Sequence, residues 1–151
     1  MGVFAMSGND TVIINNRNLS DLAEGMCAEL TFSSDISQVK TGKNGNAIFA
    51  LNATGLQADF KLRLVRGDAD DQFMNNLLSQ QNANFAGFPL MIGQFIKKIG
   101  DGKGNITNDS YIVSGGVFTK QVEAQSSVEG DTNQSVAVYT MKFSQATRVL
   151  T

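Results

Sequence analysis

The chain has 151 residues, of which 42% are hydrophobic and 17% are charged, and its formal net charge is −2. This length fits a single domain, residues 1–151, with a hydrophobic core, and the composition is not that of a disordered chain. The absence of histidine excludes a Ser-His-Asp triad and histidine metal ligands, and the single cysteine, Cys27, excludes a disulfide within the chain.

The charge balance and the first residues argue against a nucleic-acid-binding, secreted or membrane protein. There are 12 Lys and Arg against 14 Asp and Glu, whereas proteins that grip nucleic-acid phosphates usually have a basic excess. The first six residues lack the basic and apolar regions of a signal peptide, and no apolar run approaches the ~18 residues that span a membrane. We therefore expect a soluble domain made in the cytoplasm, with no membrane segment.

Period-2 alternation of apolar and polar residues dominates the chain and predicts half-buried strands. The clearest segments are residues 26–32, 56–64 and 136–143. Weaker candidates are residues 11–14, 36–40, 47–52, 90–99, 111–114 and 117–124. Glycine-rich segments at residues 42–45 and 100–104 predict hairpin turns between strands. The glycines at 100–104 do not fit a phosphate-binding loop, because such a loop opens a helix and here a strand-like segment follows.

One segment has helical spacing. Asp68 can act as the N-cap, and Asp70 and Asp71 then lie in the first turn, where carboxylates accept free backbone N–H groups. Phe73, Met74, Leu77 and Leu78 follow at the spacing of an apolar helix face. The sequence predicts one helix over residues 69–81, with Asp68 and Asp71 as its capping residues.

No pattern in the chain indicates catalysis or a cofactor. The three aspartates at 68, 70 and 71 do not have the alternation of a calcium loop, so helix capping is the favoured interpretation. Cys27 has no histidine to activate it as a nucleophile. We therefore predict a protein that is not an enzyme, with no catalytic residues, no metal site and no cofactor.

The strand pattern predicts a mainly β fold: two packed antiparallel sheets, as a β-sandwich or barrel, with one flanking α-helix. The polar strand faces are rich in uncharged side chains, since the chain contains 14 Asn, 10 Gln, 12 Ser and 10 Thr. Such a surface suits a structural subunit that packs against copies of itself or lines a wet channel.

The order of features over residues 11–81 is distinctive. An early strand at residues 11–14 is followed by a glycine hairpin at 41–46, a long strand at 56–64 and a capped helix with an N-x-x-L pattern at 75–78. This order resembles that of the tail tube proteins of tailed bacteriophages. The chain departs from that family's pattern at the helix cap, residues 66–68, and at Lys43 and Asn44 in the hairpin. Over residues 85–143, the resemblance is limited to the order of the predicted strands.

The resemblance implies a structural subunit that forms stacked hexameric rings around a channel for DNA ejection. The expected partners are other copies of the chain and the sheath, baseplate and tail terminator proteins, and DNA is expected to pass without tight binding. The expected location is the virion tail, assembled in the host cytoplasm. One polar strand face is then a candidate for the channel lining: Gln57, Asp59, Lys61 and Arg63.

The hairpin of residues 38–48 is expected to be the arm that contacts a neighbouring subunit or ring. Its tip comprises Lys40, Thr41, Gly42, Lys43, Asn44, Gly45 and Asn46. Val39, Ala47 and Ile48 at its base are expected to anchor it, and the alternative is a passive surface hairpin.

Two alternatives to the phage tail tube remain open. One is the tube of a related contractile injection or secretion system. The other is a small monomeric β-barrel binding module, which would need exposed aromatic residues for stacking. That second alternative is disfavoured because the chain has two Tyr and no Trp.

Overall fold

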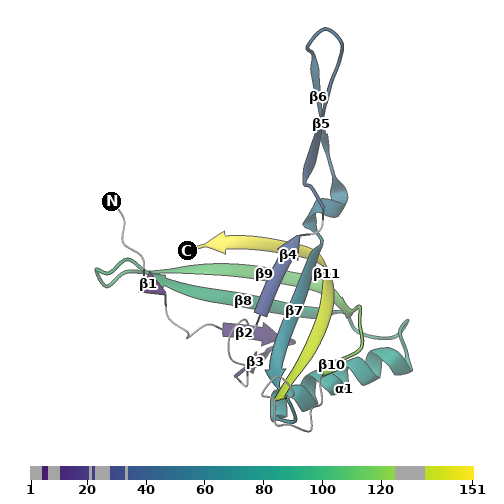
Figure 1. Ribbon diagram of the computed structural model, residues 1–151, viewed down its shortest axis with the longest axis vertical. Coiled ribbons are helices and arrows are strands. Elements are labelled where there is room, and N and C mark those ends of the chain that lie inside the picture. Colours follow the sequence, from purple (N-terminus) through teal and green to yellow (C-terminus); the bar gives the residue numbers. More distant parts are fainter. Residues whose placement is uncertain (1–4, 7–10, 21, 23–27, 33, 125–134) are drawn as a thin grey trace.

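The computed structural model describes residues 5–6, 11–20, 22, 28–32, 34–124 and 135–151 (Figure 1). Over these residues the fold is mainly β, with two antiparallel sheets and one α-helix, as predicted, and it is not a closed barrel. The first part of the chain contains β1 (Ala5–Met6), β2 (Thr11–Ile14), β3 (Arg17–Leu19), β4 (Ala28–Phe32), β5 (Ser37–Thr41), β6 (Ala47–Leu51) and the 3₁₀ turn η1 (Ala53–Leu56). The remainder contains β7 (Ala58–Val65), α1 (Ala69–Ala83), β8 (Met91–Gly100), β9 (Ile106–Phe118), β10 (Glu123–Ala124) and β11 (Val136–Leu150).

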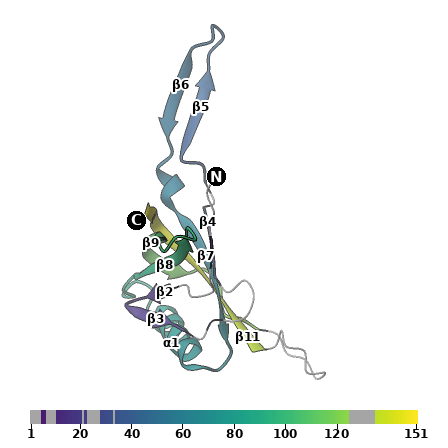
Figure 2. The same cartoon turned by 90° about the vertical axis from the view of Figure 1, so that its left-hand side faces the viewer.

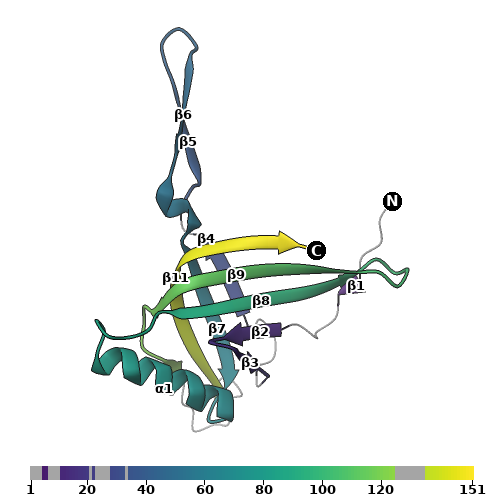
Figure 3. The same ribbon diagram turned by 180° about the vertical axis from the view of Figure 1, so that it is seen from behind.

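The larger sheet has nine strands and bends at β11. Its strand order is β3-β2-β8-β9-β11-β7-β4, with β1 added at β8 and β10 at β11. Residues 136–143 of β11 pair with β7, and residues 141–150 pair with β9. Figures 1 and 3 show β11 curving, so that β4 and β7 run across the direction of β8 and β9. The two packed layers of the fold are therefore the two halves of one bent sheet.

The core lies between these halves and follows the predicted alternation. Along β7 the buried side chains alternate strictly with half-buried ones, and β11 does the same from Val136 to Phe143. The ring of Phe60 on β7 lies 6.2 Å from that of Phe143 and 6.3 Å from that of Phe95 on β8. Because β7 and β8 are not neighbours in the sheet, the Phe60–Phe95 contact shows that the two halves pack on each other.

Strands β9 and β11 are longer than predicted. The sequence predicted separate strands at residues 111–114 and 117–124, and it predicted that the last strand ends at Phe143. In the structure β9 runs unbroken through both glycines. Gly115 has a φ of +65°, and a Cβ on Gly116 would lie 2.3 Å from Cε1 of Phe143. These glycines make room for β11 rather than forming a turn.

Helix α1 extends two residues beyond the predicted end, and Figure 3 shows it along one end of the bent sheet. Met74 and Leu78 are buried against the core. The buried side chain of Gln81 pairs with the backbone of Phe118: its Nε2 donates to the carbonyl at 2.9 Å, and its Oε1 accepts the N–H at 2.8 Å. This amide therefore fastens the helix to the end of β9.

Some predicted features lie outside the described residues. They include Cys27 and the first two residues of the strand predicted at 26–32. Within the described part of the chain, no helix is both long and apolar enough to cross a membrane.

Candidate assembly surfaces

The smaller sheet is a hairpin, β5–β6, that stands away from the body of the molecule (Figures 1 and 2). The residues predicted as the arm tip, 40–46, lie at its outer end, and every residue of both strands is exposed. The Gly42 N–H donates to the carbonyl of Asn46 at 2.7 Å, and the Gly45 N–H donates to the carbonyl of Gly42 at 3.0 Å. Gly45 has a φ of +83°, a conformation that favours glycine. The tip is therefore a defined turn. We call residues 36–52 the arm.

One face of the arm carries a row of apolar side chains. The register pairs Val39 with Phe49, Ser37 with Leu51 and Thr41 with Ala47, and paired residues share a face. The exposed fractions are 54% for Val39, 75% for Phe49 and 86% for Leu51. We call Val39, Ala47, Phe49 and Leu51 the apolar row.

The predicted anchoring of the arm at its base is wrong. Val39, Ala47 and Ile48 were expected to anchor the arm at its base, but all three are exposed, Ile48 by 70% and Val39 by more than half. The physical reason is the direction of the hairpin, which leads both strands away from the sheet (Figure 2). A two-stranded hairpin is only marginally stable alone in water. A second surface that covers the apolar face of this arm would therefore stabilise it.

The root of the arm is tightly built. The Asn52 N–H donates to the carbonyl of Ile36 at 2.9 Å and closes the hairpin. Three residues later, Gly55 in η1 lies against Asp35 and Ile36, the segment that leads into β5. A Cβ on Gly55 would lie 2.6 Å from Cα of Ile36 and 2.8 Å from the carbonyl oxygen of Asp35. Glycine at this position therefore allows the backbone contact that sets the arm's direction.

The residues predicted to line a channel lie along β7. Asp59, Lys61 and Arg63 alternate with its buried side chains and are half-buried on the outer face of the sheet, while Gln57 precedes the strand. In the register, Thr31 and Lys142 flank Asp59, and Glu29 and Thr140 flank Lys61. Each of these two rows therefore contains one acidic and one basic side chain beside a threonine. We call this surface the mixed-charge face.

The start of α1 differs in detail from the predicted cap. Asp68 lies at the N-cap with extended backbone, but its side chain makes no capping hydrogen bond. Asp71 Oδ2 instead accepts the Gly67 N–H at 2.8 Å. The hydroxyl of Tyr139 on β11 donates to Asp71 Oδ1. Burial, together with this hydrogen bond, raises the pKa of Tyr139 above its ordinary value. Asp71 thus joins the first turn to the sheet.

Asp70 has a structural role that the sequence did not reveal. Its side chain is 1% exposed, and its carboxylate accepts Arg17 Nε at 2.9 Å and the Ser20 N–H at 2.7 Å. The Arg17 guanidinium also lies 5.2 Å from the centre of the Phe73 ring. These partners are about 50 residues away in sequence, so no local pattern signals them. Within the part of the chain described, no group of three or more potential metal-ligating side chains occurs.

Comparison with known proteins shows the fold. No protein-family model matches the chain, and no curated protein matches it. Among solved structures, it is similar to a chain of the anti-feeding prophage tube terminating cap, with a TM-score of 0.62 and 10% identity over 97% of this chain and 92% of the other. This chain shares its fold.

Two further structures belong to an extracellular contractile injection system, PVC. A chain of its sheath–tube complex in the extended state has a TM-score of 0.56 and 9% identity, covering 94% of this chain and 87% of the other. A chain of its sheath/tube terminator has a TM-score of 0.55 and 9% identity, covering 95% and 94%. The fold of the chain is thus also found in chains of an extracellular contractile injection system.

Proposed function

We propose that this chain is a structural subunit of a tail tube, in a tailed phage or a related contractile injection system. The observation that carries the proposal is the arm, whose apolar row is exposed to solvent at the end of a hairpin that leaves the body. Large exposed apolar groups usually mark an interaction surface. The fold shared with proteins of tube assemblies supports the same conclusion.

The proposed assembly is a hexameric ring, with rings stacked into a hollow tube. The bent sheet is open and ends in the edge strands β3 and β4. Unpaired edge groups form hydrogen bonds with a neighbouring strand when one is available, so copies arranged around a ring can continue the sheet. The arm, including Lys40 and Lys43, would then reach the next subunit or ring.

In this tube we assign the mixed-charge face to the channel. Asp59, Lys61 and Arg63 on β7 would face the lumen, with Gln57 beside them. Since Asp59 and Glu29 lie directly beside Lys142 and Lys61 there, the wall is not a purely basic stripe that would hold phosphates. DNA or another cargo could then slide past without being retained.

The proposed location is the tail of a phage or phage-like particle, assembled in the cytoplasm of the host. Sheath, baseplate and terminator proteins are the proposed partners.

The test is the assembly state of the purified chain. We expect light scattering after size exclusion to show a hexamer, and negative-stain images at high concentration to show rings and tubes of rings. A matched variant replaces residues 42–46 with an Asn-Gly turn, which leaves Thr41 opposite Ala47 and so preserves the strand pairing, and we expect it to fold without stacking. A 16 kDa monomer at every concentration would refute the proposal and favour a monomeric binding module.

A second candidate is the ring that ends a tube. Two of the similar structures are described as a tube terminating cap and a sheath/tube terminator. A terminator subunit should form single rings that do not stack at any concentration and should block the growth of tubes made by another subunit. The same images separate the candidates, because a tube subunit alone builds tubes of many rings.

A further inference from the structure

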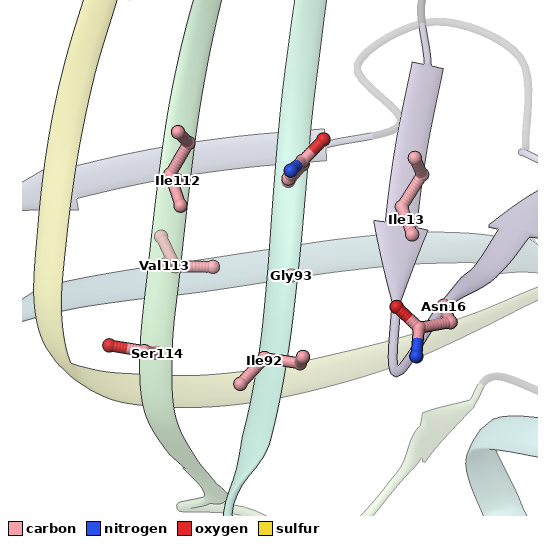
Figure 4. A pocket seen from close by; sticks show the side chains of 8 residues that line it. Ile13, Asn16, Ile92, Gly93, Ile112, Val113 and Ser114 are labelled. Carbon is pink, nitrogen blue, oxygen red and sulfur yellow. The ribbon is translucent and has the colours of Figure 1, made fainter.

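The outer face of the β2–β8–β9 layer contains a shallow apolar pocket, separate from the mixed-charge face (Figure 4). Its volume is about 290 Å³, at the lower end of the range for ligand sites. Ile13, Gln94 and Ile112 form one cross-strand row in it. The pocket is also lined by Asn16, Ile92 and Ser114. We call it the bulge pocket.

A β-bulge shapes this pocket. The pairing of β8 with β9 shifts by one residue between Met91 and Gly93. The Ile92 N–H donates to the side chain of Asn15 at 3.1 Å, and its carbonyl accepts the Asn15 N–H at 2.9 Å. Figure 4 shows Ile92 and Ile112 on neighbouring strands. They remain 49% and 46% exposed, so each contributes about half of its apolar surface to the open face.

We propose that the bulge pocket receives the apolar row of the arm from a second copy of the chain. This inference rests on the proposed function, because it names the surface on which the arm docks. The arm of the same copy is not the occupant, since Figures 1 and 3 show it extending away from the body. The occupant is therefore supplied between molecules.

Chemistry distinguishes this pocket from the other outer face. Docking the apolar row on the mixed-charge face would remove Asp59 and Lys61 from water without supplying polar partners, which is unfavourable. The bulge pocket is lined by three isoleucines, and Asn16, Gln94 and Ser114 provide polar side chains that can form hydrogen bonds with the arm's backbone. When the apolar row docks, Lys40 and Gln38 lie on the opposite face of the hairpin and keep their hydration.

Size and charge also favour the arm as the occupant. The pocket volume suits one large side chain, and Phe49 is the aromatic residue at the centre of the apolar row, paired with Val39. Residues 36–52 carry two lysines and no acidic residue, whereas the residues named above as lining the pocket are uncharged. Docking through the apolar row therefore buries no charge on either partner.

The first experiment compares two exposed residues of β6. Phe49→Ser should raise the concentration at which subunits assemble roughly tenfold or more, as expected for the loss of a buried aromatic anchor. Ile48→Ser is the matched control on the opposite face and should change it much less. Both side chains are exposed in the single chain, so the melting temperature of the unassembled subunit should be unchanged. Equal effects of the two substitutions would overturn the inference.

The second experiment locates the contact by disulfide trapping. Two proteins, both carrying Cys27→Ser, are mixed under oxidation: one carries Val39→Cys in the apolar row, the other Gln94→Cys in the pocket. We expect a cross-linked heterodimer, and a much lower yield when Gln38→Cys replaces Val39→Cys. Tubes that form without this cross-link would overturn the docking site while leaving the proposed function standing. Failure of the parent chain to associate at all would overturn both.

Discussion

At the residue scale, the polar groups buried at the helix are structural. Asp70 is 1% exposed and binds both Arg17 on β3 and the backbone of Ser20, while Gln81 binds the backbone of Phe118. Buried polar groups of this kind hold elements at fixed positions because leaving one partner unsatisfied is unfavourable. The first turn of α1 is thus fastened to β3 by Asp70 and to β11 by Asp71.

Asp70→Ala should lower the free energy of unfolding by about 2–3 kcal/mol, because hydrogen bonds to a charged group are lost. Asp68→Ala is the control. It lies two residues earlier and its side chain makes no capping bond, so it should lower the same free energy by no more than about 0.5 kcal/mol, below the usual loss for a working cap. Urea unfolding of both variants measures this difference, and equal losses would contradict the assigned roles.

The raised pKa of Tyr139 should make the protein less stable at alkaline pH. Its pKa is raised in the folded state, first by burial and then by Asp71. Above the ordinary tyrosine pKa of about 10, the unfolded chain releases a proton that the folded chain retains. The free energy of unfolding should therefore fall as pH rises, by about 1.4 kcal/mol per pH unit from this group. In the Tyr139→Phe variant, the free energy of unfolding should fall less steeply with pH above pH 10. If the parent and the variant lose stability in parallel, the role assigned to Tyr139 is refuted.

At the element scale, the strands of the arm and those of the body are held in place by different contacts. The body strands are held by a buried face, whereas β5 and β6 have no buried residue. Their direction depends on the root, where Gly55 lies against the backbone of Asp35 and Ile36. An element of this kind contributes little to the subunit's own core, so substitutions in it should affect assembly more than stability.

Gly55→Val tests the root of the arm. Its Cβ would lie 2.6 Å from Cα of Ile36, so the backbone must shift and the arm must change direction. We expect the subunit to fold, with a loss of about 1–3 kcal/mol typical of overpacking, and to lose tube formation. Gly45→Asn is the control at the other end of the arm: nothing lies within 4 Å of an added Cβ there, and asparagine tolerates positive φ. Tubes formed by Gly55→Val would show that the arm's direction is unimportant.

At the scale of the whole molecule, acidic residues slightly outnumber basic ones, 14 against 12. The net charge is −2, and on the mixed-charge face Asp59 lies beside Lys142 and Glu29 beside Lys61. The bent sheet provides two outer faces of different character, one charged and one with the bulge pocket. In the proposed tube, the charged face lines the channel and the apolar face holds neighbouring copies.

We predict that the parent protein binds duplex DNA no more tightly than about micromolar at physiological salt, the upper range of non-specific binding. Asp59→Lys in assembled tubes should strengthen binding and make it more dependent on salt, because it adds a cation to the channel wall. Asp68→Lys makes the same change in net charge at the N-cap of α1, outside the mixed-charge face, and should have less effect. Fluorescence anisotropy in a salt series measures both. A submicromolar dissociation constant for the parent would contradict the prediction.

Local pattern was sufficient for much of the fold. Alternation along residues 56–64 and 136–143 predicted β7 and the first half of β11, because one side of each strand must be buried. The helix followed from the spacing of Phe73, Met74, Leu77 and Leu78, and the glycines of residues 42–45 predicted the hairpin. These features depend on neighbours within a few residues, which a sequence displays directly.

The remaining features were decided by tertiary contacts. The sequence could not show that β11 continues to Leu150, because the continuation depends on pairing with β9, or that Gly116 accommodates the ring of Phe143. It also could not show that Asp70 binds Arg17, or that Val39 and Ile48 are exposed to solvent. Each depends on groups brought together from distant parts of the chain. The bulge pocket has the same origin, since β2, β8 and β9 form its floor only when the sheet is assembled.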